Sequence, residues 1–560
     1  MHSRICYFVV HGVVKRVIAV GGRRIASLNI ILERLESFQG VLRLNKLQDL
    51  NLYPNEFTEF PSLGGLPSLT SLDLASNFLK NSNNFEELTT LSNLEVLKLG
   101  NNLITSEIAS SIARLTSLKT LSLADNKLNG LWPVERMCKL KNLEELDLSA
   151  CGLEGKLPPC LCNLTSIRSL ELSKNNFNGT IPSTLFFSLK SLEYVSLSEN
   201  LFEGLFSFSS LANNSILVVF KLASHNNLLR VETEIPRPLP IEFCKLNELR
   251  YVDLSHNNIG PTIPPCANML SLNYLHLQRN DFRETIPIFI SKACSLVTLD
   301  MRDNKLSGGI PKRITSVSNL RILLLKGNNL DGLIPIHLCQ LKNISILDLS
   351  HNHFSGSIPP CLKDITFGWR RTLDGPFSIK DQNRSLFVNS YKTQLPIKAL
   401  DYYLEYYTFY EAEGVGFLTK SRYETYMGNV LYFMSGIDLS CNNLTGQVPS
   451  EIGNLSWIIT LNLSYNQLTG VIPETFSNLK QIQSLDLSHN RLSGQIPSQL
   501  IELTFLSFFK VSYNNLSGRT PQRQAQFATF DKSSYEGNIF LCGEPRRNVV
   551  PTLTIMLHRL

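Results

Sequence analysis

Residues 319–335 read NLRILLLKGNNLDGLIP, and residues 343–359 repeat the phrase as NISILDLSHNHFSGSIP. Leucine, asparagine, glycine and an Ile-Pro pair return at the same places in both. A fixed period of this length predicts a solenoid of small stacked units rather than one globular core. The asparagines of the phrase are spaced 24 residues apart in two series: Asn280, Asn304, Asn328 and Asn352, then Asn442, Asn466, Asn490 and Asn514.

The positions of the phrase L-x-x-L-x-L-x-x-N, present in seventeen copies, each have a physical reason. Alternating leucines predict a short strand with leucine side chains inward and the intervening residues facing solvent. One unit cannot bury its leucines alone, so neighbours must stack into a parallel sheet. The asparagine amide can donate to carbonyls of adjacent coils. The predicted fold class is an α/β leucine-rich-repeat solenoid, a horseshoe or superhelix with the parallel β-sheet on its concave face.

Composition narrows the function. The 560 residues carry a net charge of only +6, and 43% of them are hydrophobic, so a nucleic-acid partner is not expected. No phosphate-binding glycine loop, GxSxG or HExxH motif is present, so we expect no enzyme activity, cofactor or metal. Cys138, Cys162, Cys244 and Cys339 occupy matching repeat positions, and we interpret them as small buried apolar residues.

Nine Asn-x-Ser/Thr sequons predict passage through the secretory pathway. The candidate glycosylation sites are Asn163, Asn178, Asn213, Asn343, Asn383, Asn443, Asn454, Asn462 and Asn515.

The repeat breaks once, because 90 residues separate Asn352 from Asn442. We therefore expect an island at about 366–433, and a structureless loop of that length would be unusual. Its tyrosines, as in LDYYLEYYTFYEAEG (400–414), either pack the island onto the inner sheet or form a recognition surface. The island candidates for partner contacts are Tyr402, Tyr403, Tyr406, Tyr407, Lys420, Arg422 and Tyr426.

The L-x-G-x-I-P ending resembles the plant-specific leucine-rich repeat. The layout of about thirteen repeats, an island and four repeats, with the island exit FLTKSRYETYMGNVLYFMSGIDLSCNNLTG (417–446), resembles plant leucine-rich-repeat receptor-like proteins. The resemblance implies a cell-surface receptor without a kinase, at the extracellular face of the plasma membrane, that serves defence or development. It also implies signalling through partner receptor kinases, with a co-receptor docking on the island and the last four repeats.

The concave face is the predicted ligand site, because it offers a wide rigid surface with aromatic and arginine side chains. The ligand would be an extracellular peptide, protein or glycan. The candidate residues are Tyr251, Asp253, His256, Tyr274, His276, Gln278, Arg279, Asp300, Arg302, Asp303 and Lys326.

The ends of the chain depart from the resembled family. Residues 1–20 make a poor secretory signal, Cys6 is interpreted as a remnant of a cap, and no run of 18 apolar residues follows the repeats. The alternative function is therefore a secreted decoy or an inhibitor of cell-wall-degrading enzymes, similar to polygalacturonase-inhibiting proteins. The expected segments are a degenerate N-terminal segment (1–43), repeats (44–365), the island (366–433), four repeats (434–520) and a cap remnant with a tail (521–560).

Overall fold

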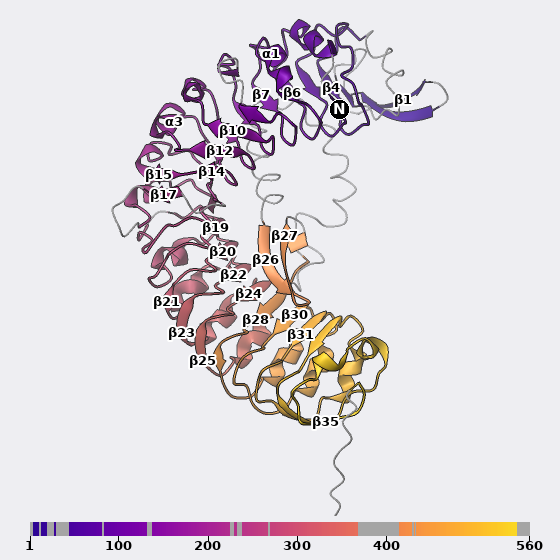
Figure 1. Ribbon diagram of the computed structural model, residues 1–560, viewed down its shortest axis with the longest axis vertical. Helices are drawn as coiled ribbons and strands as arrows, with labels where there is room; N and C mark the ends of the chain where they lie inside the picture. The colour runs from indigo at the N-terminus through magenta and orange to yellow at the C-terminus, as the bar shows by residue number, and fades with distance from the viewer. Residues whose placement is uncertain are drawn as a thin grey trace, which may run out of the picture. The chain divides into compact units, whose positions relative to one another are not determined.

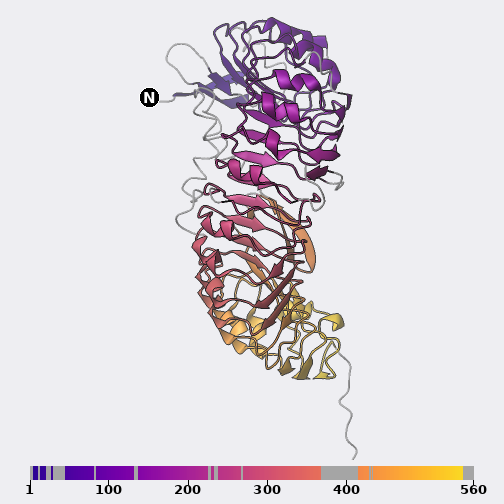
Figure 2. The same ribbon diagram turned by 90° about the vertical axis from the view of Figure 1, so that its left-hand side faces the viewer.

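The computed structural model describes residues 4–10, 13–19, 27–29, 44–80, 83–131, 137–224, 229–231, 238–266, 269–367, 414–427, 430–431 and 433–545. These residues fall into two compact units, unit 1 up to Leu272 and unit 2 from Asn273 onward. Each unit is a stack of short strands, most of them parallel (Figures 1 and 2). The predicted leucine-rich-repeat solenoid is confirmed.

One strand per coil builds the main sheet, and successive strands pair in parallel. In unit 1 these are β3 (Ser27–Asn29), β4 (Asp49–Asn51), β5 (Ser71–Asp73), β6 (Val96–Lys98), β7 (Thr120–Ser122), β9 (Glu145–Asp147), β11 (Ser169–Glu171), β13 (Tyr194–Ser196), β16 (Val219–Lys221) and β18 (Tyr251–Asp253). In unit 2 they are β19 (Tyr274–His276), β20 (Thr298–Asp300), β22 (Ile322–Leu324), β24 (Ile346–Asp348), β28 (Gly436–Asp438), β30 (Thr460–Asn462), β31 (Ser484–Asp486) and β33 (Phe508–Lys510).

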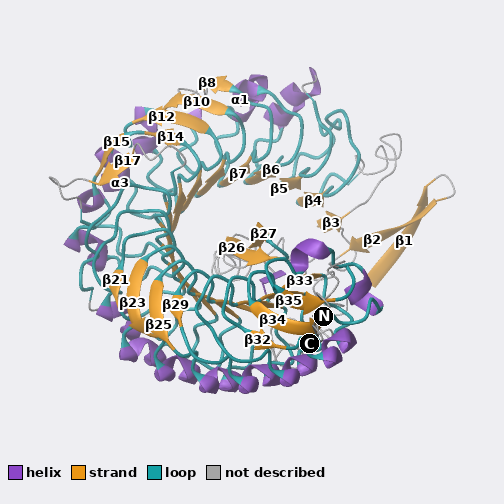
Figure 3. Ribbon diagram, turned by 60° about the horizontal axis from the view of Figure 1, so that its bottom comes forward, coloured by secondary structure: helices purple, strands orange, loops and turns teal. Residues whose placement is uncertain are grey.

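Short helices line the side of each coil opposite these strands (Figure 3). The α-helices are α1 (Ala109–Ile112) and α3 (Ser183–Ser188). The 3-10 helices span Asn83–Thr90, Ser106–Ile108, Pro159–Asn163, Phe208–Ser210, Ile241–Lys245, Ile288–Lys292, Lys312–Ser316, Ile336–Gln340, Pro360–Asp364, Ser450–Asn454, Glu474–Asn478, Ser498–Glu502, Ala525–Ala528 and Lys532–Ser534. We call the two sides of a coil the sheet face and the helix face.

Smaller strands follow the repeat asparagines and pair between neighbouring coils. They are β8 (Gly130–Leu131), β10 (Leu153–Lys156), β12 (Asn176–Gly179), β14 (Leu201–Phe202), β15 (Gly204–Phe206), β17 (Leu229–Val231), β21 (Ser307–Gly308), β23 (Asn329–Leu333), β25 (His353–Gly356), β29 (Asn443–Leu444), β32 (Ser493–Gly494), β34 (Asn515–Arg519) and β35 (Phe540–Cys542). At the N-terminus, β1 (Arg4–Val10) and β2 (Val13–Ala19) form an antiparallel hairpin, and β2 pairs with β3.

The middle residue of each main strand, leucine in most coils, points into the core, as the alternation predicts. Leu72, Leu121, Leu299 and Leu461 are fully buried. In the last main strand, Phe509 packs on Phe527, Phe530 and Tyr535, which follow the strand, with ring centroids 5.1, 5.6 and 6.0 Å away. These aromatic side chains cover the leucine core at the end of the stack.

The repeat asparagines form a hydrogen-bonded ladder between coils. Asn466 Nδ2 donates to the carbonyl of Leu439 in the preceding coil (3.0 Å) and to Leu463 and Ser464 in its own. Its Oδ1 accepts from the amide of Leu444 (3.1 Å). One side chain therefore satisfies several buried backbone groups of two coils, and the predicted role of the amide is confirmed.

The ladder is continuous across the island. Asn442 Nδ2 donates to the carbonyl of Leu349 (3.0 Å), and its Oδ1 accepts from the amide of Phe354 (3.0 Å), although 88 residues separate Phe354 from Asn442. Strand β24 pairs directly with β28. The coils before and after the island are immediate neighbours.

Three disulfides correct the interpretation of the repeat cysteines. Cys138, Cys244 and Cys339 are not apolar fillers but bond to Cys160, Cys266 and Cys361, each 22 residues later. A separation of 22 is almost one 24-residue coil, so the two sulfurs meet between neighbouring coils. Each second cysteine follows a Leu-Pro-Pro or Ile-Pro-Pro phrase, a sequence signal that we overlooked. Cys162 is a half-buried free thiol.

We expect Asn466→Ala to lower the free energy of local opening of its coils by about 3 kcal/mol, because buried carbonyls and one amide lose their partner. Amide hydrogen exchange of residues 436–470 measures this. Asn478→Ala, at an exposed asparagine of the same unit, is the control. Equal loss of protection in both variants would contradict the ladder's role.

We expect a non-reducing peptide map of the secreted chain to recover the three disulfide pairs, with Cys294, which is exposed, labelled as a free thiol. Replacing Cys339 and Cys361 together by serine should cost about 3 kcal/mol of unfolding free energy, since a closed loop of this length constrains the unfolded chain. Cys294→Ser should leave thermal stability unchanged. Free thiols at Cys339 and Cys361 in the unaltered chain would refute the pairing.

Candidate functional site

The end of the island is an antiparallel hairpin that lies against the sheet face of unit 2 (Figure 1). Strand β26 (Gly414–Thr419) pairs with β27 (Arg422–Met427). Lys420 and Ser421 make the two-residue turn with φ of 50° and 62°, the left-handed geometry that hairpin turns require. Most of β26 is buried, whereas most of β27 is exposed. Strand β26 therefore attaches the hairpin, and β27 forms its outer surface.

An apolar cluster attaches β26 to the sheet. Val415 and Phe417 are fully buried, and they pack with Ile322, Leu324, Ile346, Leu431 and Met434. The Phe417 ring lies over Gly436, where an added Cβ would come within 2.6 Å of a ring atom. Only glycine at position 436 lets the ring approach so closely.

Polar contacts fix the two ends of the hairpin. The Arg302 guanidinium binds the Asp300 carboxylate through two nitrogens, with Nε 2.8 Å from Oδ1. Its Nη1 donates to the carbonyl of Gly416 (2.6 Å). Both Arg302 and Asp300 are buried, so this charged pair is shielded from solvent. At the turn, the amide of Lys420 donates to Ser484 Oγ (3.2 Å). The hairpin thus spans the sheet from β20 to β31.

Tyr423, in β27, lies next to the Arg302 contact and has the Lys326 side chain beside its ring. Its hydroxyl donates to the carbonyl of Gly416 (3.2 Å), and the Lys326 ammonium lies 4.6 Å from its ring centroid. Tyr423 is 45% exposed. The ammonium and the ring therefore make a cation–π contact on the outer surface of the hairpin.

A row of stacked rings marks the last repeats. Tyr465, His489 and Tyr513 occupy the same position in successive coils, with ring centroids 4.0 and 4.4 Å apart. All three have left-handed backbones, with φ between 52° and 56°. Partial burial and nearby Lys510 lower the pKa of His489. The two tyrosines remain about half exposed, so the row is available to a partner.

The sheet face of unit 1 carries a network of its own. The Tyr194 hydroxyl donates to Glu171 Oε2 (2.5 Å), and the Lys221 ammonium lies 4.6 Å from the ring centroid of Tyr251 and 5.7 Å from that of Tyr194. Burial lowers the pKa of Lys221, an effect that Glu171 and Asp253 oppose. The charged and aromatic side chains on this part of the sheet face therefore interact with one another.

Burial corrects the predicted ligand residues. Tyr251, Tyr274, His276, Asp300 and Arg302 are all less than 7% exposed, so they cannot form an open contact surface. Arg302 and Asp300 instead hold the hairpin. The accessible or half-accessible candidates are Asp253, His256, Gln278, Arg279, Asp303 and Lys326.

The island candidates divide in the same way. Lys420 and Arg422 are exposed, whereas Tyr426 is half-buried and its hydroxyl bonds Thr419. Tyr402, Tyr403, Tyr406 and Tyr407 lie outside the described residues. Val415, Phe417 and Gly436 were missed. The sequence did carry a signal for this contact. On the sheet face of β22 and β24, apolar Ile322, Leu324 and Ile346 replace the polar residues usual in this repeat.

Most of the predicted glycosylation sites are exposed to solvent. Asn163, Asn178, Asn213, Asn443, Asn454 and Asn515 are exposed, and Asn343 is half-buried. The predicted glycosylation of Asn462 is wrong. Its side chain is buried, and the amide donates to Asp438 Oδ2 (3.1 Å), which leaves no room for a glycan. Asn383 lies outside the described residues.

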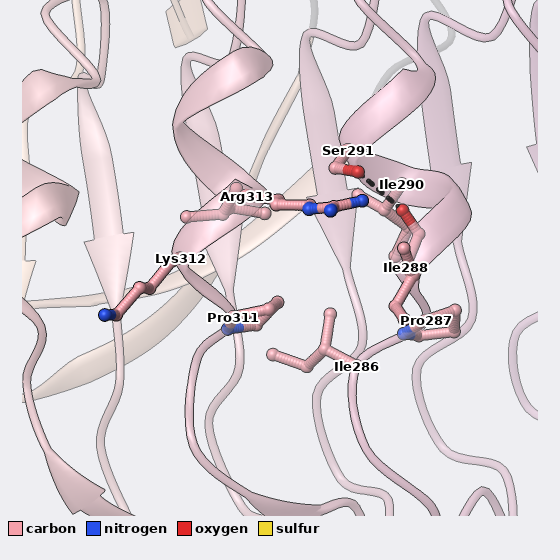
Figure 4. Close-up of a pocket in the computed structure, with 9 residues that line it drawn as sticks. Ile286, Pro287, Ile288, Ile290, Ser291, Pro311, Lys312 and Arg313 are labelled. Carbon is pink, nitrogen blue, oxygen red and sulfur yellow. Dashed lines mark hydrogen bonds between the residues drawn. The ribbon is translucent and has the colours of Figure 1, made fainter.

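A hollow of about 230 Å³ lies on the helix face between the 3-10 helices Ile288–Lys292 and Lys312–Ser316 (Figure 4). Its walls come from successive Ile-Pro phrases, including Ile286, Pro287 and Pro311, and Arg313 extends across it toward Ser291. It is a gap between repeats and contains none of the predicted site residues.

Comparison with known proteins agrees with this geometry. Leucine rich repeat families match residues 142–164, 166–187, 246–263, 295–317, 319–341, 343–365 and 435–492. Cuscuta receptor 1 of Solanum lycopersicum is 78% identical over 134 residues, which are 24% of this chain and 12% of that protein. The chain is a leucine-rich-repeat protein, similar to plant receptor-like proteins. The matched segment spans only a small part of that relative's length.

Two solved plant ectodomains share the fold over most of the chain. The receptor kinase GASSHO1/SCHENGEN3 of Arabidopsis thaliana, in complex with CASPARIAN STRIP INTEGRITY FACTOR 2, has a TM-score of 0.60 and 27% identity over 90% of this chain and 57% of its own. The Arabidopsis receptor kinase HAESA, in complex with the peptide hormone IDA and the co-receptor SERK1, has a TM-score of 0.51 and 26% identity over 95% and 93%. Among the described residues of this leucine-rich-repeat protein, no helix has the length and apolar content needed to cross a membrane.

We expect Gly436→Ala to displace the Phe417 ring and loosen the hairpin while the coils stay folded. Overpacking of this kind costs about 1–3 kcal/mol, so protection of the β26 amides against hydrogen exchange should fall about tenfold or more. Gly309→Ala is the control, since its added Cβ would meet no atom closer than 3.7 Å. Unchanged protection in Gly436→Ala would show that Phe417 does not anchor the hairpin.

Proposed function

We propose that this chain is the ligand-binding part of a plant cell-surface receptor without a kinase of its own. It binds an extracellular peptide, protein or glycan and signals in defence or development through a partner receptor kinase. The observation that carries the proposal is the island hairpin, which is fixed by buried contacts to the sheet of a leucine-rich-repeat protein similar to Cuscuta receptor 1. Such a surface holds another molecule and does not transform it.

A peptide is the favoured class of ligand. GASSHO1/SCHENGEN3 and HAESA, which share the fold at 27% and 26% identity, are complexed with CASPARIAN STRIP INTEGRITY FACTOR 2 and with the peptide hormone IDA. In unit 2, Arg279 faces Asp303 at 3.4 Å across an exposed ion pair, and Lys326 lies beside Tyr423. Arginine and tyrosine side chains of this kind dominate binding surfaces.

The proposed co-receptor surface is the stacked row of Tyr465, His489 and Tyr513, together with Lys420 and Arg422 at the hairpin turn. The row lies in the repeats that follow the island, and its tyrosines present about half of their surface to solvent. The turn reaches the same repeats through Ser484. Island and last repeats therefore offer one partner both aromatic and cationic contacts.

The proposed location is outside the cell. The three disulfides between neighbouring coils require an oxidising compartment, which secreted and cell-surface proteins occupy. The six exposed sequons support the same placement.

The test is capture of the SERK1 ectodomain by the chain secreted from plant cells. We expect Tyr465→Ala combined with Tyr513→Ala to weaken capture at least tenfold, because buried aromatic contacts at interfaces contribute more than about 1.4 kcal/mol each. Deleting 366–433 and rejoining the coils should abolish it. Phe505→Ala, at an exposed aromatic residue of the same unit, is the matched control.

Capture that survives deletion of the island would remove the island from the co-receptor surface. If the unaltered chain captures no SERK1 and instead inhibits a fungal polygalacturonase, the receptor proposal fails and the secreted-inhibitor alternative replaces it.

A further inference from the structure

Beneath the hairpin, one row of side chains on the sheet of unit 2 is shut off from solvent. The third residue of each strand points to the sheet face, and Asp300, Leu324, Asp348, Asp438 and Asn462 are at most 5% exposed. At the turn end of the hairpin and past it, Asp486 and Lys510 in the same row are half-buried. In unit 1 the corresponding residues of β5, β6, β7, β9 and β11 are also half-buried. The hairpin therefore covers a buried stretch of the row, although Ser196 of β13 and His276 of β19 are buried as well.

Two carboxyl groups lie next to each other in this closed row. The parallel pairing of β24 with β28 places Asp348 directly opposite Asp438, and neighbouring strands lie about 4.8 Å apart. Asp348 Oδ1 accepts from the amide and hydroxyl of Ser350 (3.0 and 2.6 Å), but its buried Oδ2 has no hydrogen-bond partner. Asp438 accepts from the Ser440 amide (2.9 Å) and from Asn462 Nδ2 (3.1 Å).

Two cations, Lys326 and Arg302, lower the pKa of Asp348 without offsetting its burial, and both have other partners. Arg302 is engaged by Asp300 and Gly416, and Lys326 is half-buried against the Tyr423 ring. Strand β26 turns apolar Val415 and Phe417 toward the sheet, and Thr419 bonds Tyr426. Other titratable groups near the pair's strands include His351, Cys441 and Asp486 on the coils, and Tyr426 and Lys420 on the hairpin.

Two adjacent buried carboxylates with so little positive charge cannot both ionise without a large cost. A proton held between them supplies the donor that Asp348 Oδ2 lacks. Burial raises the pKa of both groups. Lys326 and Arg302 partly oppose this at Asp348, whereas Asp348 adds to the effect on Asp438, whose pKa reaches about 7.

We propose that Asp348 and Asp438 share one proton while the β26–β27 hairpin is docked, and that loss of this proton releases the hairpin from the sheet face. The inference rests on the proposed function, because it makes pH a regulator of the surface formed by the island and the last repeats. Acidic surroundings keep the hairpin docked, and a rise in pH frees it.

The direction follows from the two states. Docked, Asp438 holds its proton up to about pH 7; released, the two carboxyls gain solvent, and their pKa falls toward the ordinary aspartate value near about 4. The docked state therefore keeps its full stability below the pKa of the released pair and loses it progressively as the pH rises to about 7. Each pH unit in this window shifts the equilibrium by up to about tenfold, and above about pH 7 no further change is expected.

Hydrogen exchange of residues 414–419, corrected for the intrinsic dependence of exchange on pH, tests the proposal on the unaltered chain. We expect protection to fall up to about tenfold per unit between pH 5 and 7. Asp438→Asn and Asp348→Asn, which keep the shape and remove the shared proton, should each flatten this profile. Asp147→Asn is the matched control, since Asp147 occupies the same strand position in unit 1 and burial also raises its pKa.

A flat profile in the unaltered chain, or a full pH dependence that persists in both variants, would overturn the proposal. If the variants fold poorly, the profile of the unaltered chain still decides, because it requires no substitution. The measurement contains neither ligand nor co-receptor. Failure of the shared proton is thus separate from failure of SERK1 capture, which tests the receptor function.

Discussion

The asparagine ladder is the constraint on which the rest of the structure depends. In most coils the amide, as at Asn328, bonds carbonyls of two coils and accepts an amide proton of the preceding one, so these coils do not satisfy their buried backbone without a neighbour. The ladder explains how the repeat tolerates an island of this length. Asn442 bonds the coil that ends before the island, so the inserted residues leave the stack at one point and return to it at the same level.

The helix face and the sheet face of the coils have different roles. The helix face carries the disulfides, which tie neighbouring coils where an oxidising environment permits them. The sheet face carries the hairpin and most of the buried charge. Because the disulfides lie away from the sheet face, the coils can be locked together while the island is held by weaker, reversible contacts.

Some of the contacts that hold the hairpin do not depend on pH, and others do. The Phe417 ring over Gly436 and the Arg302 fork onto Asp300 and Gly416 define where the hairpin lies. The adjacent carboxyls of Asp348 and Asp438 oppose docking as soon as both are charged. A binding surface built from a rigid sheet and a hairpin of adjustable stability can respond to its surroundings without any change in the coils.

The sequence by itself determined the repeat, the inward leucines and the asparagine ladder, because these follow from periodicity, which is local and readable along the chain. It also indicated which residues belong to the sheet face. Only the tertiary structure decided which of them a partner can reach. Arg302 and Gly416 are 114 residues apart, and Cys339 meets Cys361 only because one coil lies on the next. Burial of the Asp348–Asp438 pair arises in the same way, since it depends on an insertion folding back onto strands that its own sequence does not specify.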